Sequence, residues 1–241
     1  MNILLDGLFP QYCALCGLRS LESQPLCHGC AGDLVPNTDS CLQCAIPLAG
    51  LFPSTATGME RRCGRCLSHP PAFSRARVPW LYDDQIAFLI QRWKFGGQRQ
   101  LTGLLARLWL QRCHKTSDVD VLVPVPLHWR RIMRRGFNQS ELVCRELQRL
   151  SPELHDTPVA RMVRRSRATA AQSGMDARQR AGNLRNAFTV KEPCDNLRIA
   201  VVDDVLTTGA TAQAMAQALR AAGASDVEIW CLARTPAPGY R

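Results

Sequence analysis

Two adjacent carboxylates and a following turn of hydroxyl and glycine residues are the groups of this sequence best suited to bind a phosphorylated sugar. Asp203 and Asp204 follow the apolar run 199–202. Such a run favours a buried strand of a parallel sheet, and ligands bind parallel sheets beyond the carboxyl ends of the strands. The turn before the next helical segment offers backbone amides and hydroxyl groups to a phosphate, and the carboxylates suit sugar hydroxyls. The turn consists of Thr207, Thr208, Gly209, Ala210 and Thr211.

Eight of the twelve cysteines form four C-x-x-C pairs within the first 66 residues. Each pair places two thiolates on one edge of a tetrahedral metal ion, so the four pairs supply two complete sites. Adjacency groups the first two pairs and the last two, while an interleaved pairing, disulfides and an iron–sulfur centre are alternatives. We predict two structural Zn²⁺ sites. Their ligands are Cys13, Cys16, Cys27, Cys30, Cys41, Cys44, Cys63 and Cys66.

The cysteine-rich segment is interpreted as a structural module. Eight protein ligands for two ions leave no coordination position for a catalytic water, and a bound metal stabilises a piece too small to fold alone. Docking of nucleic acid or of a protein partner is the alternative. Residues 1–80 contain six Arg and five acidic residues, so the charge of this segment does not favour a strong DNA clamp.

The remaining sequence alternates between helical and strand-like patterns. Apolar spacing predicts helices over residues 83–95, 100–113, 138–150 and 212–222, and strands over 119–126, 159–163, 198–202 and 226–232. Strands separated by helices favour an α/β fold with a parallel sheet and flanking helices. Pro70, Pro71 and Pro79 indicate a linker. We therefore expect a small domain over residues 1–72 and a larger one over residues 80–241.

Positive charge is concentrated in the middle of the chain. The net charge is +10, and only three of the 30 basic residues are Lys. Residues 128–180 contain twelve Arg and five acidic residues. This excess lies in two segments, 124–140 and 164–188, which we expect to be loops. Arg is well suited to clamp pyrophosphate or a nucleic-acid backbone, although a solvated surface is the alternative for each single Arg.

The segment 199–212 resembles the binding motif of type I phosphoribosyltransferases for phosphoribosyl pyrophosphate (PRPP). That motif is an apolar strand, two acids, two further residues and T-T-G-x-T. The resemblance implies that Asp203 and Asp204 hold the ribose 2′ and 3′ hydroxyls and that residues 207–211 wrap the 5′-phosphate, with Mg²⁺ bound alongside PRPP. In the alternative interpretation the Asp and Thr side chains only cap helices, but the complete pattern argues against it.

The whole chain resembles the ComF/GntX family, the amidophosphoribosyltransferase-like competence proteins. The resemblance rests on F-P-x-x-C-x-x-C near the start, P-V-P-L followed by R-R-G-F-N-Q, then Q-S-G with R-x-x-N, and the PRPP motif. It implies a double zinc ribbon before a phosphoribosyltransferase-like domain. It also implies a pyrophosphate contact after the early strand and a covering loop near residues 164–180. The candidates are Pro126, Leu127, Arg130, Arg131, Arg134, Arg135, Gln139, Arg167, Gln172, Arg178 and Arg180.

The family resemblance implies a DNA-uptake or DNA-utilisation factor that handles incoming single-stranded DNA together with uptake machinery. Trp129 and Phe137 are then candidates for base stacking. An active phosphoribosyltransferase with an unidentified acceptor and a non-catalytic PRPP sensor are the alternatives. No apolar run reaches eighteen residues, and residues 1–10 lack the pattern of a signal peptide, which argues against disulfides. We expect a cytoplasmic protein that reaches the inner membrane only through its partners.

Overall fold

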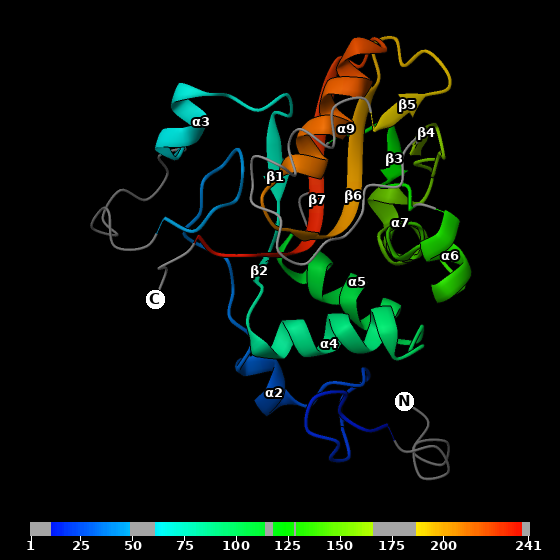
Figure 1. Cartoon of the computed structure of the whole chain (residues 1–241). Helices are drawn as coiled ribbons and strands as arrows, with labels where there is room; N and C mark the ends of the chain where they lie inside the picture. The colour runs from blue at the N-terminus through cyan, green and yellow to red at the C-terminus, as the bar shows by residue number, and fades with distance from the viewer. Residues whose placement is uncertain (1–10, 49–60, 114–117, 128, 166–186, 238–241) are drawn as a thin grey trace.

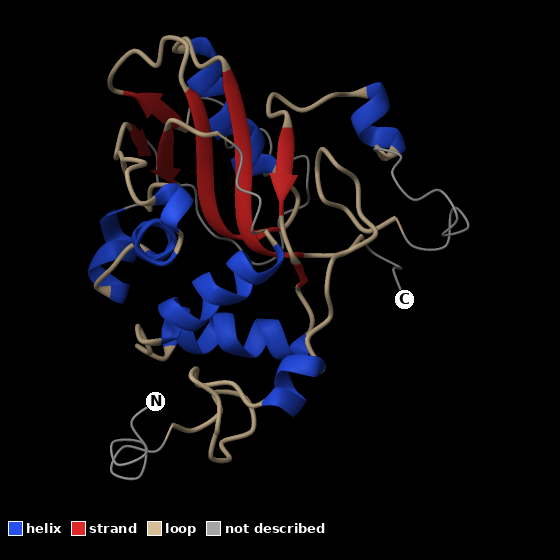
Figure 2. Ribbon diagram, turned by 180° about the vertical axis from the view of Figure 1, so that it is seen from behind, coloured by secondary structure: helices blue, strands red, loops and turns tan. Residues whose placement is uncertain are grey.

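A parallel sheet forms the centre of the molecule. The computed structural model describes residues 11–48, 61–113, 118–127, 129–165 and 187–237. Within them the strand order is β1 (Arg75–Arg77), β7 (Asp226–Arg234), β6 (Arg198–Leu206) and β3 (Val121–Pro124), and β2 (Trp80–Leu81) also pairs with β7. Every pairing in this sheet is parallel (Figure 2). The predicted α/β fold with a parallel sheet is therefore confirmed.

Helices cover both faces of the sheet (Figure 1). On one face lie α4 (Asp84–Phe95), α5 (Leu101–Arg112) and α7 (Gln139–Leu150); on the other lies α9 (Ala210–Ala221) beside an antiparallel pair, β4 (Val163–Arg165) and β5 (Phe188–Val190). Successive side chains of a strand point to opposite faces. Ala200 and Val202 of β6 accordingly belong to the first core, whereas Ile199 and Val201 belong to the second.

The long helices begin and end where local chemistry dictates. The Asp83 carboxylate accepts a hydrogen bond from the Ile86 amide at 2.9 Å and so caps α4. The indole of Trp93, buried on the inner face of α4, donates to Thr102 Oγ1 of α5 at 2.9 Å. At the other end of the chain, Gly223 follows α9 with a φ of +102°, a conformation that ends the helix without a side-chain clash.

Three predicted elements differ from the structure. The strand predicted over residues 159–163 is wrong: Val159 makes only an isolated bridge to Leu122, and β4 begins at Val163. The segment 124–140, predicted as a loop, contains the helix α6 (Trp129–Arg135). The Arg, Met and Ile residues of this segment favour a helix, which ends before Gly136. The strand predicted to stop at Val202 continues to Leu206, because β7 pairs with it to Arg234 while β3 stops at Pro124.

The two cysteine-rich modules pack differently. In the first, which contains α2 (His28–Gly32), Cys13, Ala14 and Leu26 join the core beneath α4, and Arg92 of α4 donates to the Ala14 carbonyl at 2.9 Å. The second, which contains α3 (Gly64–Ser68), has a small core of its own. Figure 1 places it beside β1, away from α4 and α5. Strand β1 lies between the two predicted domain ranges, 1–72 and 80–241, in the segment that was predicted to be a linker. None of the helices described is long and apolar enough to span a bilayer.

Candidate functional site

Two groups of four cysteines have the geometry of zinc sites. Within each group the sulfur atoms lie within 4.8 Å of one another, and the groups follow adjacency along the chain. The Cys16–Cys27 and Cys44–Cys63 sulfur distances are 3.8 and 3.7 Å, close to the edge of about 3.8 Å expected for a tetrahedron with Zn–S bonds of about 2.3 Å. A hydrogen bond between the two thiols lowers the pKa of Cys41 to about 4 and raises the pKa of Cys44, as expected for cysteines that share one site.

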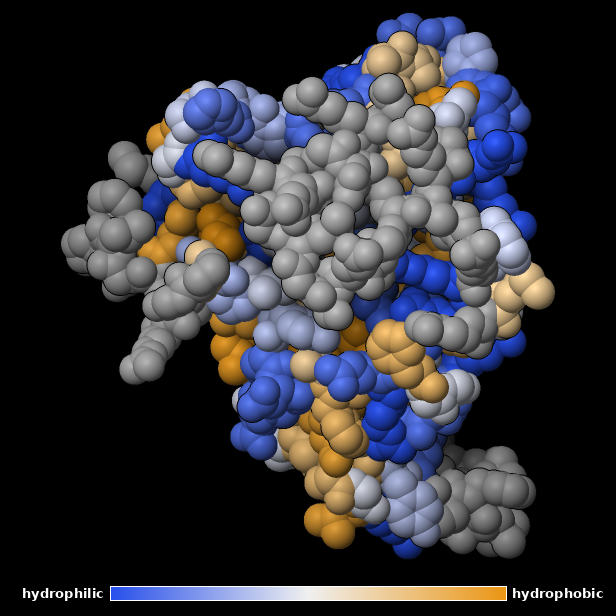
Figure 3. All heavy atoms as spheres, in the orientation of Figure 1, coloured by the Kyte–Doolittle hydropathy of each residue, from blue (hydrophilic) through white to orange (hydrophobic). Residues whose placement is uncertain are grey.

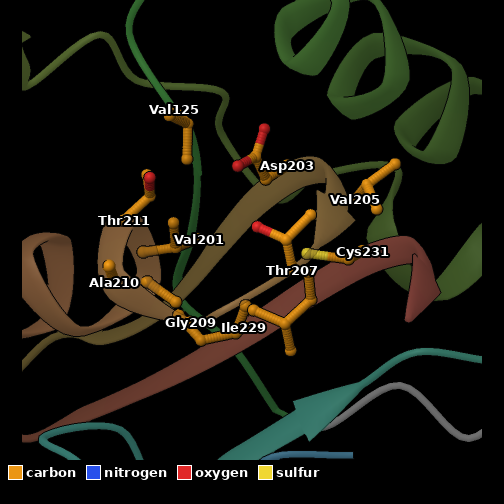
Figure 4. Close-up of a pocket in the computed structure, with 12 residues that line it drawn as sticks. Val125, Val201, Asp203, Val205, Thr207, Gly209, Ala210, Thr211, Ile229 and Cys231 are labelled. Atoms are coloured by element: carbon orange, nitrogen blue, oxygen red, sulfur yellow. The ribbon is translucent and has the colours of Figure 1, made fainter. Parts of the chain in front are cut away.

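The structure places both carboxylates of the acidic pair within β6, where Asp203 contacts Ser140 of α7 and Asp204 contacts Lys94 of α4. Asp203 lines a small cavity together with Val201, Ile229 and residues of the following turn (Figure 4). The volume of this cavity is about 30 Å³, the space of about one water molecule. A phosphoribosyl group is larger than this cavity, and Thr207, one of the lining residues, is exposed.

Asp203 has an environment that disfavours its charge. Burial and the neighbouring Asp204 carboxylate raise the pKa of Asp203 to about 7. Two groups oppose this effect by donating hydrogen bonds to Asp203 Oδ1: the Asp204 amide at 2.9 Å and the Ser140 hydroxyl at 3.3 Å. Perturbed carboxyl groups of this kind are common at functional sites.

Asp204 is paired with a lysine that the sequence analysis did not single out. Lys94 Nζ of α4 lies 2.7 Å from Asp204 Oδ2, and both side chains are less than one fifth exposed. Lys94 stands in the last turn of α4, just before two glycines, and no motif marks it. Its position on the helix face toward the sheet is a tertiary feature that spacing alone does not reveal.

The turn after β6 has the backbone of an anion-binding loop. Gly209 adopts a φ of +79° and precedes the first residue of α9, so a residue with a side chain would be strained there. The Thr208 hydroxyl accepts a hydrogen bond from the Ala210 amide at 3.3 Å. The twelve-residue α9 directs its amino-terminal amides and the positive end of its dipole toward this turn.

The R-G-F-N-Q-S segment holds α7 against the acidic pair. Asn138 caps α7 by accepting from the Ser140 amide, and its own amide donates to the Val125 carbonyl at 3.1 Å. Gln139 is 1% exposed, and among the described residues neither of its amide atoms has a hydrogen-bond partner. A buried amide without a partner is costly, so a ligand that reached Gln139 would gain by satisfying it.

The surface next to this segment combines cations with apolar side chains. Trp129, Ile132 and Met133 of α6 are 58%, 40% and 77% exposed, and Figure 3 shows apolar and hydrophilic surface side by side on this edge. Arg135 lies 4.7 Å from the ring centre of Phe95. The suggestion that Phe137 stacks on a base is wrong, because Phe137 is 7% exposed, with the Arg99 guanidinium over its ring.

The remaining predicted contacts divide into two groups. Pro126 and Leu127 follow β3 and are half-buried, and Arg131 lies on α6. The backbone of Arg130 and Arg134 belongs to α6, but their side chains are outside the described part of the structure. Four candidates lie wholly outside the described residues: Arg167, Gln172, Arg178 and Arg180.

Comparisons with known proteins match both parts of the chain. The double zinc ribbon domain family matches residues 4–67. The "DNA utilization protein YhgH" of Escherichia coli (strain K12) is 37% identical over 233 residues, which cover 94% of this chain and 98% of the relative. "Competence protein F" of Haemophilus influenzae is 32% identical over 225 residues, covering 86% and 96%. "Competence protein ComFC" of Streptococcus pneumoniae is 27% identical over 158 residues, covering 66% and 67%. The predicted double zinc ribbon is thus confirmed.

Proposed function

Because this chain belongs to the YhgH/ComF family of DNA utilization and competence proteins, we propose that it handles incoming single-stranded DNA and binds PRPP in its α/β domain. The observation that carries this proposal is the continuity of the two surfaces. The exposed Trp129, Ile132 and Met133 of α6, with the half-buried Arg131 and Arg135 beside them in the helix, are followed directly by the segment whose Ser140 contacts Asp203. DNA and nucleotide precursor would therefore meet on one side of the sheet.

The ligand-binding roles follow from the placement of the groups. Asp203 and Asp204 would accept hydrogen bonds from the ribose hydroxyls, and residues 207–211 would surround the 5′-phosphate. Arg131 and Arg135 of α6 would face the pyrophosphate, with Mg²⁺ bridging phosphate and sugar oxygens. Lys94 holds Asp204 at 2.7 Å, so binding requires the ribose to share this carboxylate with the lysine.

Calorimetric titration with PRPP tests the ligand half of the proposal. We expect saturable binding that requires Mg²⁺ and changes when single-stranded DNA is already bound. Steady release of pyrophosphate in the presence of a base or an amine would identify the protein as a transferase. The absence of any PRPP binding by the zinc-replete protein would remove this half of the proposal and leave DNA handling by the arginines.

Trp129→Ala is expected to weaken binding of single-stranded DNA by about 5- to 100-fold, since stacking of a base on an aromatic side chain contributes about 1–3 kcal/mol. Fluorescence anisotropy of a labelled oligonucleotide measures the effect. Tyr12→Ala is the matched control, because Tyr12 is equally exposed, at 59%, but belongs to the first metal module. Equal losses in both variants, or affinity that does not fall with added salt, would contradict a binding face on α6.

A further inference from the structure

One buried arginine connects the second metal module to the phosphate turn. Arg234, the last residue of β7, is 7% exposed. Its Nε donates to the Cys44 carbonyl at 3.1 Å, and its Nη1 donates to the Leu206 carbonyl at 2.8 Å and to the Thr207 carbonyl. A single guanidinium thus contacts a residue of the second cysteine group and the first residue of the turn.

The charge of Arg234 is balanced in an unusual way. Its hydrogen bonds go to backbone carbonyls, and no carboxylate pairs with it in the described part of the chain. A zinc ion bound by four thiolates carries a net charge of about −2, so the filled site would supply the counter-charge that a buried cation needs.

The contact crosses a cleft between the two parts. A cavity of about 650 Å³ is lined on one side by Cys44, Cys63 and Cys66 and on the other by residues 208–210 and α9. Figure 3 shows apolar surface near this place, beside the second module. The hydrogen bonds of Arg234 connect the two walls of this cavity.

We propose that Arg234 is a positioning residue that links zinc at Cys41, Cys44, Cys63 and Cys66 to the conformation of residues 207–211. Zinc in this site holds the Arg234 guanidinium in place, and the guanidinium in turn holds the Leu206 and Thr207 carbonyl groups at the start of the turn. Zinc in this site then raises the affinity for PRPP, and by reciprocity PRPP raises the affinity for this zinc ion by the same factor. The ligand named here rests on the proposed function, whereas the coupling between metal and turn does not.

Two measurements on wild-type protein and two Arg234 variants test the coupling. PRPP with Mg²⁺ should slow the release of one of the two zinc ions to a chelator by about 5- to 30-fold, as expected for a coupling of about 1–2 kcal/mol. In Arg234→Met this protection should disappear and PRPP affinity should fall by a similar factor. Arg234→Lys keeps the charge but cannot reach both carbonyl groups, so an intermediate effect is expected.

Arg220→Met is the matched control. Arg220 also donates to backbone carbonyls, including that of Ala72, but it lies at the far end of α9 and contacts neither the turn nor a cysteine ligand. Its substitution should leave zinc release and PRPP affinity within about twofold of wild type. If wild-type protein binds PRPP but the Arg234 variants bind it equally well and release zinc at the same rate, the coupling is refuted while the proposed function stands.

If wild-type protein does not bind PRPP, the proposed function fails, and hydrogen exchange still decides the coupling. Amides of residues 207–211 should exchange at least about fivefold faster in Cys41→Ser, which loses the second ion, than in wild type. The same substitution in the first site, Cys16→Ser, should leave them unchanged. Equal exchange in all three proteins would overturn the link between metal and turn.

Discussion

Asp203→Asn is expected to weaken PRPP binding at least about tenfold and, at pH 8, to raise the melting temperature by about 2–8 °C. The first effect follows from the loss of a charged hydrogen-bond acceptor for the ribose, which contributes about 1.5–3 kcal/mol. The second follows from the raised pKa of Asp203, about 7, caused by burial and by Asp204. Asparagine keeps Oδ1 as an acceptor for Ser140 while removing the charge.

The sign of the stability effect depends on pH. In the unfolded chain an Asp ionises at about pH 4. Between that pH and about 7, the Asp203 carboxyl group is therefore charged in the unfolded chain but mostly neutral in the folded protein. The free-energy cost of the buried charge is absent below about pH 4 and complete above about pH 7. Above pH 7, removing the charge should stabilise the folded protein by about 1–2 kcal/mol, and each kcal/mol should raise the melting temperature by about 2–4 °C. Thermal melts at pH 4 and pH 8 measure the difference, and wild type and variant should coincide at pH 4.

The neighbouring residue provides the control for this prediction. Asp204→Asn removes the partner of Lys94, whose side chain is only 16% exposed, and should lower the melting temperature at pH 8. Opposite shifts for two adjacent Asp→Asn changes would support the assignment of the two carboxylates to different environments. Destabilisation by both at pH 8 would contradict a charge penalty at Asp203.

Removal of zinc is expected to unfold the second metal module while the first stays folded longer. The second core consists of Cys41, Leu48 and Cys66, so two of its three buried residues are themselves ligands. Structural zinc contributes apparent binding free energies of about 10–16 kcal/mol, which a core of this size cannot replace. In the first module, Leu26 and Leu34 are buried against the main core and persist without the metal.

Limited proteolysis during chelation measures this difference. Cleavage within residues 41–48 and 61–69 should precede cleavage within residues 11–34. Cys113→Ser serves as a control because Cys113 belongs to neither cysteine group and should retain two zinc ions per chain. Simultaneous cleavage of both modules would show that they depend equally on their ions.

Much of the fold could be predicted from sequence because its main elements carry strong local signals. The spacing of Ile86, Leu89, Ile90 and Trp93 predicted α4, and of the adjacent and interleaved pairings that the sequence left open, the adjacent one matches both cysteine groups. Strands β1 and β2 escaped prediction because three and two residues contain too little pattern, and they are stabilised by pairing with β7. Helix α6 was hidden by its arginines, which suggested a loop.

The residue types of the site could be predicted from the sequence, but the contacts between the site and distant elements could not. The acidic pair and the turn stand together in sequence, so a motif reveals them. Lys94 and Arg234 reach the site from elements that begin far away in the chain, and a single cation at the end of a helix or strand has no distinctive spacing. Contacts of this kind are determined by tertiary packing.

The central position of β7 has a consequence for synthesis of the protein. Strands β1, β2 and β6 all pair with β7, which ends at Arg234 of the 241 residues. Their edges toward β7 stay unpaired on the ribosome until β7 emerges, which is a state prone to aggregation. All eight zinc ligands lie between Cys13 and Cys66, so the two ions can bind first. The nascent chain can therefore acquire its zinc before it has a sheet, and a chain terminated before Asp226 would be a metallated but incomplete protein.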